Sequence, residues 1–212
     1  MDDFVKGIAF VFEGYTEKYF YLSLMEHLSA KYRCQLKQDP IEDYCILKCP
    51  HSKKIVKTIV VGTNTQVPNS GHWFKNVCFK NHDKIPWIVF LCYDADDYLS
   101  NITKFHEGDW KDLRENYLCD AQNVVDLTAH ADIEDIMLAD FEGVCNYIKI
   151  DSSSVPHGRK GKSKMKYLFR LGKQHYHEGK RAKPLISSLN KDIIMQKAKN
   201  KEMRFFINIL QT

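Results

Sequence analysis

An uninterrupted apolar segment, Trp87 to Tyr93 (WIVFLCY), constrains the fold of this chain more than any other feature. A strand without alternating polar residues is typical of a parallel sheet that helices cover on both faces. The segment ends directly in acidic residues, Asp94-Ala95-Asp96-Asp97. The sequence therefore predicts a central buried strand with carboxylates at its carboxyl end.

Apolar and amphipathic segments alternate over the first part of the chain. The predicted strands are residues 7–12, 44–47, 58–61, 87–93, 123–127 and 145–150, and the predicted helices are residues 16–28, 102–118 and 131–141. Residues 51–57 (HSKKIVK) fit a strand or a helix start, and Thr16 is suited to cap the first helix. The alternation indicates an α/β domain over residues 1–150, with a largely parallel sheet flanked by helices.

The last part of the chain differs in composition. A polar loop at residues 152–164 precedes predicted helices at 163–176, 182–200 and 201–210, so residues 151–212 form a basic helical appendage. Residues 157–212 carry 15 Lys and Arg against 3 Asp and Glu, whereas the first 156 residues carry 16 against 24. Such a basic tail suits attraction of a polyanion, although a solvated surface that complements the acidic body fits equally well.

Composition and cysteine usage indicate a cytoplasmic protein. The beginning of the chain (MDDFVKG) lacks the pattern of a signal peptide, and the apolar runs are shorter than the roughly 18 residues of a membrane-spanning helix, so no membrane partner is expected. The seven cysteines form no CxxC pair, which predicts reduced thiols. A zinc site from Cys45, Cys49 and His51 is a weaker alternative to cysteines half-buried on a strand, because no fourth ligand is evident.

Acidic residues follow three of the predicted strands. They are Glu13 with Glu17, Asp94 with Asp96, and Asp132 with Glu134. Ligands of open parallel sheets bind beyond the carboxyl ends of the strands, and carboxylate oxygens are preferred by Mg²⁺ and Mn²⁺. The combination predicts one or two divalent cations. Each group also has a structural explanation, since a DxD turn can simply be solvated and acids in a first helical turn favour the helix dipole.

These motifs resemble a known family. The segment EGYTEKYF, beginning at Glu13, and the later strand followed by Asp94 and Asp96 resemble the TOPRIM domain of topoisomerases, bacterial primases and small nucleases. This EGxTEKYF form is most similar to the compact RloB-like and OLD-like nucleases of bacterial defence. Residues 131–134 (ADIE) resemble the SDLE motif of the OLD branch, with Ala131 in place of its serine. The resemblance covers about residues 7–142.

The resemblance implies an Mg²⁺- or Mn²⁺-dependent endonuclease that acts in antiviral defence. Glu13, Glu17, Asp94 and Asp96 would surround the metal, and Asp132 or Glu134 would complete a second site that the missing serine leaves open. It also implies a catalytic lysine, for which Lys162 and Lys164 are the nearest candidates. No ATPase half precedes the motif, so the resemblance implies another trigger or a regulatory partner such as an ATPase.

Basic residues near the loop suit contacts with phosphates of nucleic acid, DNA or RNA. They are Arg159, Lys160, Lys162, Lys164, Lys166 and Arg170. Interspersed aromatic residues, Tyr167, Phe169 and Tyr176, fit stacking on bases or packing of a helix on the sheet. Gly161-Lys162-Ser163 looks like the end of a phosphate-binding loop, but Pro156 stands where the first glycine is required.

The sequence thus predicts a metal-dependent phosphodiester nuclease, with three alternatives. In a phosphatase of the haloacid-dehalogenase type, Asp94 would be the nucleophile and Asp96 the acid, which leaves Glu13 unexplained. A glycosyltransferase could use the same DxD to hold the metal of a nucleotide sugar. A binding module for nucleic acid or a protein partner would need none of these acids for catalysis.

Overall fold

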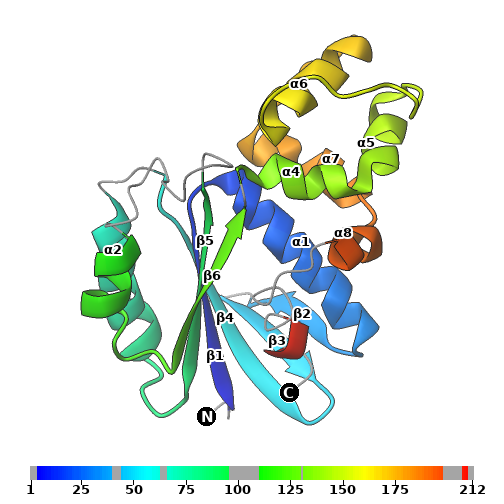
Figure 1. Ribbon diagram of the computed structural model, residues 1–212. Helices are drawn as coiled ribbons and strands as arrows, with labels where there is room; N and C mark the ends of the chain where they lie inside the picture. Colours follow the sequence, from blue (N-terminus) through cyan, green and yellow to red (C-terminus); the bar gives the residue numbers. More distant parts are fainter. Residues whose placement is uncertain are drawn as a thin grey trace.

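The computed structural model describes residues 4–39, 44–62, 66–95, 110–129, 131–197 and 207–209. One twisted sheet lies between two layers of helices (Figure 1). The α/β class and the largely parallel sheet predicted from the sequence are confirmed.

The sheet has six strands in the order β2-β3-β4-β1-β5-β6. Strands β4, β1, β5 and β6 are parallel, and the β2–β3 and β3–β4 pairs are antiparallel. The bounds are β1 Lys6–Phe12, β2 Gln35–Gln38, β3 Cys45–Cys49, β4 Ser52–Val60, β5 Trp87–Asp94 and β6 Asn123–Ala129.

Helices cover both faces of the sheet. One face carries α2, the π-helix η2, the segment at 110–112 and the π-helix η3, with bounds α2 Val67–Trp73, η2 Phe74–Phe79 and η3 Leu113–Tyr117. The other face carries α1 and the later helices, with bounds α1 Tyr15–Lys31, α4 Ile133–Met137, η4 Leu138–Asp140, α5 Phe141–Ile148, α6 Gly161–Leu171, η5 Gly179–Ala182, α7 Lys183–Ser188 and α8 Lys191–Lys197.

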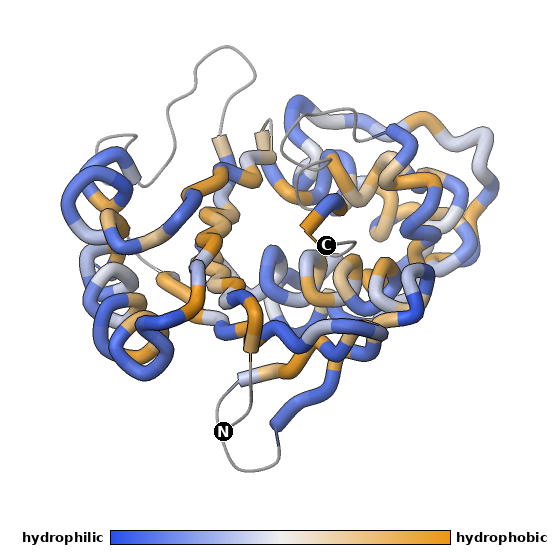
Figure 2. Tube along the Cα trace, turned by 90° about the horizontal axis from the view of Figure 1, so that it is seen from below, coloured by the Kyte–Doolittle hydropathy of each residue, from blue (hydrophilic) through white to orange (hydrophobic). Residues whose placement is uncertain are grey.

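Strand β1 shows why the central strands are apolar at successive positions. Phe10 belongs to the hydrophobic cluster under α1, whereas Ala9 and Val11 belong to the cluster under Trp110 on the opposite face. Phe10 also stacks on Phe90 of β5, with ring centroids 5.1 Å apart. Both sheet faces are therefore buried, and the tube in Figure 2 is mostly hydrophobic where it runs through the middle of the sheet.

Some local predictions were wrong. Residues 145–150 were predicted as a strand, but α5 extends to Ile148 and ends at Lys149 in a left-handed conformation. The buried residues Val144, Cys145 and Ile148 have helical spacing, which the short apolar run concealed. Residues 52–57 are part of β4, and strand β2 and the helical segment 67–79 were not predicted.

The basic appendage begins as a helix earlier than predicted. Helix α6 starts at Gly161, within the predicted loop 152–164. Its buried residues Met165, Leu168 and Phe169 belong to the same hydrophobic cluster as Phe10 of the sheet. The two-part division at residue 150 stays a prediction. Among the helices of the described ranges, none combines the length and hydrophobicity needed to cross a lipid bilayer.

The prediction that all thiols are reduced was wrong for Cys34 and Cys49, which form a disulfide. Gln35 is paired with Lys48 across β2 and β3, so the two cysteines occupy the next positions of the same antiparallel ladder, with Cα atoms 4.2 Å apart. Cys49 is therefore not a thiolate ligand for the alternative zinc site. Cytoplasmic localisation stays a prediction.

Candidate functional site

The parallel strands β1, β5 and β6 have their carboxyl ends on the same side of the sheet, which lies uppermost in Figure 1. Phe12 of β1 pairs with Cys92 of β5, and Asp94 of β5 pairs with Ala129 of β6. The register therefore brings together residues far apart in sequence. Five carboxylates, each 2% to 8% exposed, form what we call the acidic cluster: Glu13, Glu17, Asp94, Asp132 and Glu134.

Glu13 connects β1 to β5. Its backbone N–H donates to Cys92 O at 2.9 Å, and its carboxylate Oε2 accepts a hydrogen bond of 2.8 Å from the backbone N–H of Asp94. Backbone and side chain thus hold the carboxylate across the ends of two strands.

Glu17 lies in the first turn of α1, whose N-cap is Gly14. A Cβ atom at Gly14 would stand 2.8 Å from Glu17 Oε2, so this carboxylate folds back over the Glu13-Gly14 turn. Thr16, expected to cap α1, instead accepts a hydrogen bond of 2.8 Å from the backbone N–H of Gly179. The glycine permits the close approach of the glutamate, and the threonine ties the later part of the chain to α1.

The pKa of the Asp94 carboxyl is raised strongly by its surroundings. Burial raises its pKa to about 10, and the negative charges of Glu17, Glu13, Glu134 and Asp132 contribute further, in that order. Its Oδ1 atom is buried and has no hydrogen-bond partner among the described residues. Without a compensating cation, these effects favour the protonated form of the Asp94 carboxyl.

Glu134 is joined to a residue of the C-terminal segment. The hydroxyl of Tyr176 donates a hydrogen bond of 2.6 Å to Glu134 Oε1. Burial raises the pKa of Glu134 to about 7, while the hydrogen bond from Tyr176 acts in the opposite direction. The pKa of Tyr176 is itself raised, first by burial and then by Glu134. The neutral phenol therefore remains a donor over the whole physiological pH range.

Asp132 has a structural role between two helices. It caps α4, with Oδ1 accepting from the N–H of Asp135 at 3.2 Å, and its Oδ2 accepts from the N–H of Lys162 in α6 at 2.9 Å. Burial raises its pKa, and the hydrogen bond from Lys162 opposes this shift. A Cβ at Gly161 would lie 2.2 Å from Asp135 N, so only glycine permits this approach of α6 to α4. Of the two acids proposed for a second metal, Asp132 is thus the one whose two carboxylate oxygens accept hydrogen bonds from backbone N–H groups.

The predicted basic residues lie on or beside α6. Lys162 forms an ion pair with Glu178, Lys166 approaches the same carboxylate at 3.7 Å, and Lys164 pairs with Asp135 at 3.2 Å. These ion pairs join α6 to neighbouring segments. The catalytic role of Lys162 or Lys164 stays a prediction, as do the phosphate contacts of Arg159, Lys160 and Arg170.

One pocket of about 400 Å³ borders the site. It is lined by Ser163, Lys166, Arg170, His175 and Tyr176. Tyr176 both lines this pocket and donates its hydroxyl to Glu134, so the pocket adjoins the acidic cluster through this tyrosine. The arrangement suits an anion held next to the carboxylates.

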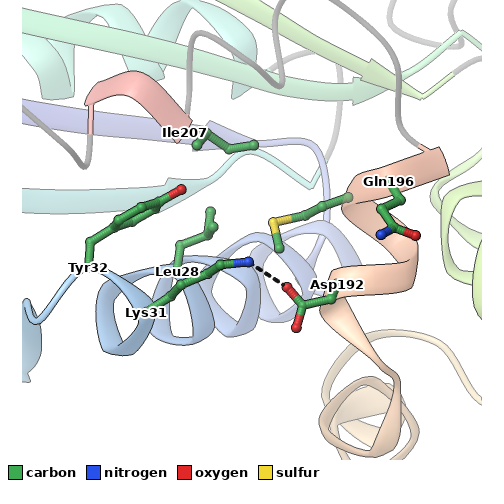
Figure 3. Close-up of a pocket in the computed structure, with 7 residues that line it drawn as sticks. Leu28, Lys31, Tyr32, Asp192, Gln196 and Ile207 are labelled. Carbon is green, nitrogen blue, oxygen red and sulfur yellow. Dashed lines mark hydrogen bonds and ion pairs between the residues drawn. The ribbon is translucent and has the colours of Figure 1, made fainter.

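A second pocket of about 220 Å³ lies at the other end of α1 (Figure 3). Its lining includes Leu28, Lys31 and Asp192, and Lys31 donates to Asp192 at 3.0 Å. The rise of a helix places Lys31 about 21 Å along the axis from Glu17. This pocket is therefore separate from the acidic cluster.

The residues present fit a divalent cation in their chemistry but not in their present geometry. Carboxylate oxygens are hard ligands, and Asp94 Oδ1 faces no donor in the described part of the chain. However, no group of three or more His, Cys, Asp or Glu side chains within the described ranges is close enough to hold a metal ion. Asp96, also predicted as a ligand, lies outside these ranges.

Sequence reasoning missed two contacts that organise the site. Tyr176 was considered for stacking or packing, but its hydroxyl binds Glu134. Gly179 binds Thr16, more than 160 positions earlier in the chain. No local pattern indicates such partners, because both depend on how the segment after α6 returns to α1.

Comparison with known proteins adds no relative. The sequence matches no known protein family, and a search of curated proteins found no similar sequence.

Proposed function

We propose that this protein is a divalent-cation-dependent nuclease that cleaves phosphodiester bonds of DNA or RNA, similar to TOPRIM nucleases. The observation that carries the proposal is the burial of Asp94 among Glu13, Glu17 and Glu134 at the carboxyl ends of parallel strands. Buried carboxylates that raise one another's pKa are costly for a fold, and a bound cation offsets this cost.

Glu13, Glu17 and Asp94 are the residues that would hold Mg²⁺ or Mn²⁺, with Glu134 available for a second ion. By resemblance, Asp96 joins them. When bound, the cation supplies charge to stabilise the leaving oxygen and to lower the pKa of an attacking water. The hydrogen bond from the backbone N–H of Asp94 holds the Glu13 carboxylate at the end of β5, which supports the proposal because phosphoryl transfer depends mainly on positioning.

The substrate class follows from charge. Lys166 and Arg170 line the pocket beyond Tyr176, where they suit a phosphate of a nucleic acid strand that crosses the acidic cluster. Glu13 favours the nuclease over the phosphatase alternative, since a reaction with Asp94 as nucleophile gives this buried glutamate no role. A function in bacterial antiviral defence, and control by a partner such as an ATPase, rest on the resemblance alone.

The experiment is a cleavage assay on labelled plasmid, single-stranded DNA and total transfer RNA in Mg²⁺, Mn²⁺ or EDTA. Wild type is compared with Glu13→Gln, Asp94→Asn and the control Asp83→Asn, an exposed acid in the turn at the opposite end of β5. We expect cation-dependent cleavage by wild type and Asp83→Asn, and a loss of most or all cleavage by the other two variants. Cleavage that survives in Glu13→Gln and Asp94→Asn would contradict the proposal.

A further inference from the structure

A group of tyrosines and lysines lies beside the acidic cluster. Tyr15 and Tyr19, one turn apart on α1, have ring centroids 6.4 Å apart with planes inclined by 27°. Lys180 Nζ lies 5.1 Å from the centre of the Tyr15 ring, and Lys183 Nζ lies 5.7 Å from that of Tyr19. We call these four residues the tyrosine–lysine face.

The backbone positions the lysines of this face. The N–H of Gly179 donates to Thr16 Oγ1 at 2.8 Å, and Gly179 has a φ of 66°, which favours glycine. This contact places η5 and the start of α7 against the first turn of α1. The nearby acid Glu178 pairs with Lys162 and Lys166, so its charge is already compensated.

Tyr15 is unusually exposed for an aromatic residue in such a position. Its neighbours in sequence, Glu13, Thr16 and Glu17, are buried, whereas Tyr15 is 43% exposed. It is the first residue of α1, two positions from Glu13 and two from Glu17 in the sequence. A tyrosine needed only to pack α1 against the sheet would be buried on the inner side of the helix.

We propose that the tyrosine–lysine face binds single-stranded nucleic acid. One base displaces Lys180 Nζ from the Tyr15 ring and stacks there, and Lys180, Lys183 and the exposed Arg181 bind neighbouring phosphates. The inference rests on the proposed function, which supplies nucleic acid as the substrate class. It adds that the bound nucleic acid is single-stranded. A base within a duplex is stacked on both faces, so only an unpaired, unstacked base can use an aromatic platform. Stacking tolerates any base, whereas the cations bind the backbone.

The test measures binding without cleavage, by fluorescence anisotropy of the full chain in EDTA. The probes are a fluorescein-labelled oligothymidylate, a strand of equal length with abasic sites, and a duplex of the same length. Variants Tyr15→Leu, which keeps apolar bulk, and Tyr15→Phe, which keeps the ring, are compared with wild type. Lys84→Ala, an exposed charge at the opposite end of β5, is the matched control for Lys180→Ala.

We expect Tyr15→Leu to weaken oligothymidylate binding at least about fivefold, which is the effect of losing one stacked base. Binding of the abasic strand should change less than about twofold, because it depends on phosphates alone. Tyr15→Phe should bind like wild type, Lys180→Ala should weaken both strands, and Lys84→Ala neither. Wild type should bind the duplex more weakly than oligothymidylate. Melting temperatures confirm that each variant is folded.

Three results would overturn the inference: no binding of oligothymidylate by wild type, unchanged binding by Tyr15→Leu, or equal losses for the thymidylate and abasic strands. Equal losses of affinity for the two strands would mean that Tyr15 only supports η5 and does not stack on a base. The inference and the proposed function fail separately. If cleavage depends on the cation but substitution of Tyr15 does not change binding, only the inference about single-stranded nucleic acid is contradicted. If binding depends on Tyr15 but no cleavage occurs, only the proposed nuclease activity is contradicted.

Discussion

The backbone N–H of Asp94 donates to the carboxylate of Glu13 across 2.8 Å, although 81 positions separate the two residues in sequence. The bond joins the carboxyl ends of the neighbouring strands β1 and β5, which are the two strands that carry the strongest acidic motifs. It orients Glu13 without neutralising it, because an amide donor brings no net charge. Burial first, and then the charges of Glu17 and Glu13, raise the pKa of Asp94 to about 10.

Replacing Glu13 by Gln should separate stability from activity. An amide oxygen still accepts the bond from Asp94 N, but one negative charge leaves the acidic cluster. We expect cleavage to fall on the order of 100-fold or more, since a cation ligand is lost. The melting temperature in EDTA should rise by about 2 to 4 °C, which corresponds to roughly 1 kcal/mol for a chain of this size. A lower melting temperature in EDTA would contradict the repulsion described above.

Stability without metal should fall as the pH rises. The pKa of Glu134 is raised from 4.5 to about 7 and that of Asp94 from 3.8 to about 10. Between the ordinary and the raised values, the folded state binds more protons than the unfolded state, so the free energy of unfolding decreases with pH. Urea denaturation in EDTA between about pH 5 and pH 8 measures this slope. Mg²⁺ should flatten the slope, and stability that increases over this range in EDTA would rule out the predicted linkage.

Tyr176→Phe should change the pH dependence of cleavage while leaving the fold intact. The hydrogen bond from Tyr176 lowers the pKa of Glu134, so its removal raises that pKa. If Glu134 acts as a carboxylate, the acid limb of the pH–rate profile should move upward by up to about one pH unit. Tyr167→Phe, which alters a tyrosine whose ring contacts His157, is the matched control. A profile that does not move would exclude Glu134 from the reaction.

Gly161→Ala should destabilise the contact of α6 with α4. The added Cβ would lie 2.2 Å from Asp135 N and 2.4 Å from Asp132 Oδ1, and one of these atoms belongs to the backbone. We expect a loss of about 1 to 3 kcal/mol in the free energy of unfolding, the usual cost of overpacking. Gly14→Ala provides the contrast, since its Cβ meets only the end of the flexible Glu17 side chain. Equal losses in the two variants would contradict the close packing at Gly161.

Reduction of the disulfide should lower stability without abolishing cleavage. Cys34 and Cys49 are 15 positions apart, and closing a loop of this length contributes about 3 kcal/mol. The disulfide joins β2 to β3 at the far edge of the sheet from β5. Denaturation of wild type with and without dithiothreitol measures the difference in the free energy of unfolding. The variant Cys49→Ser should show no such difference, because it cannot form the disulfide. Exposed Cys119 serves as the control through Cys119→Ser.

The sequence by itself determined the class of the fold and the positions of the strand-end acids. Trp87 to Tyr93 is apolar at every position because the two sheet faces are both buried, and that requirement is visible in composition alone. Glu13 and Asp94 could be placed at one edge because parallel strands end on the same side. Short apolar runs such as 145–150 were misassigned, since a few apolar residues fit either period.

Only the tertiary structure decided which groups surround each carboxylate. The bonds of Tyr176 to Glu134 and of Lys162 N to Asp132, and the pairing of Cys34 with Cys49, join segments whose local sequences carry no sign of one another. Burial and the sum of neighbouring charges set the pKa of Asp94, and both depend on the packing of α1, α4 and the sheet. A sequence pattern reports the period of an element, whereas electrostatic energies and hydrogen bonds depend on distances that exist only after the elements have packed.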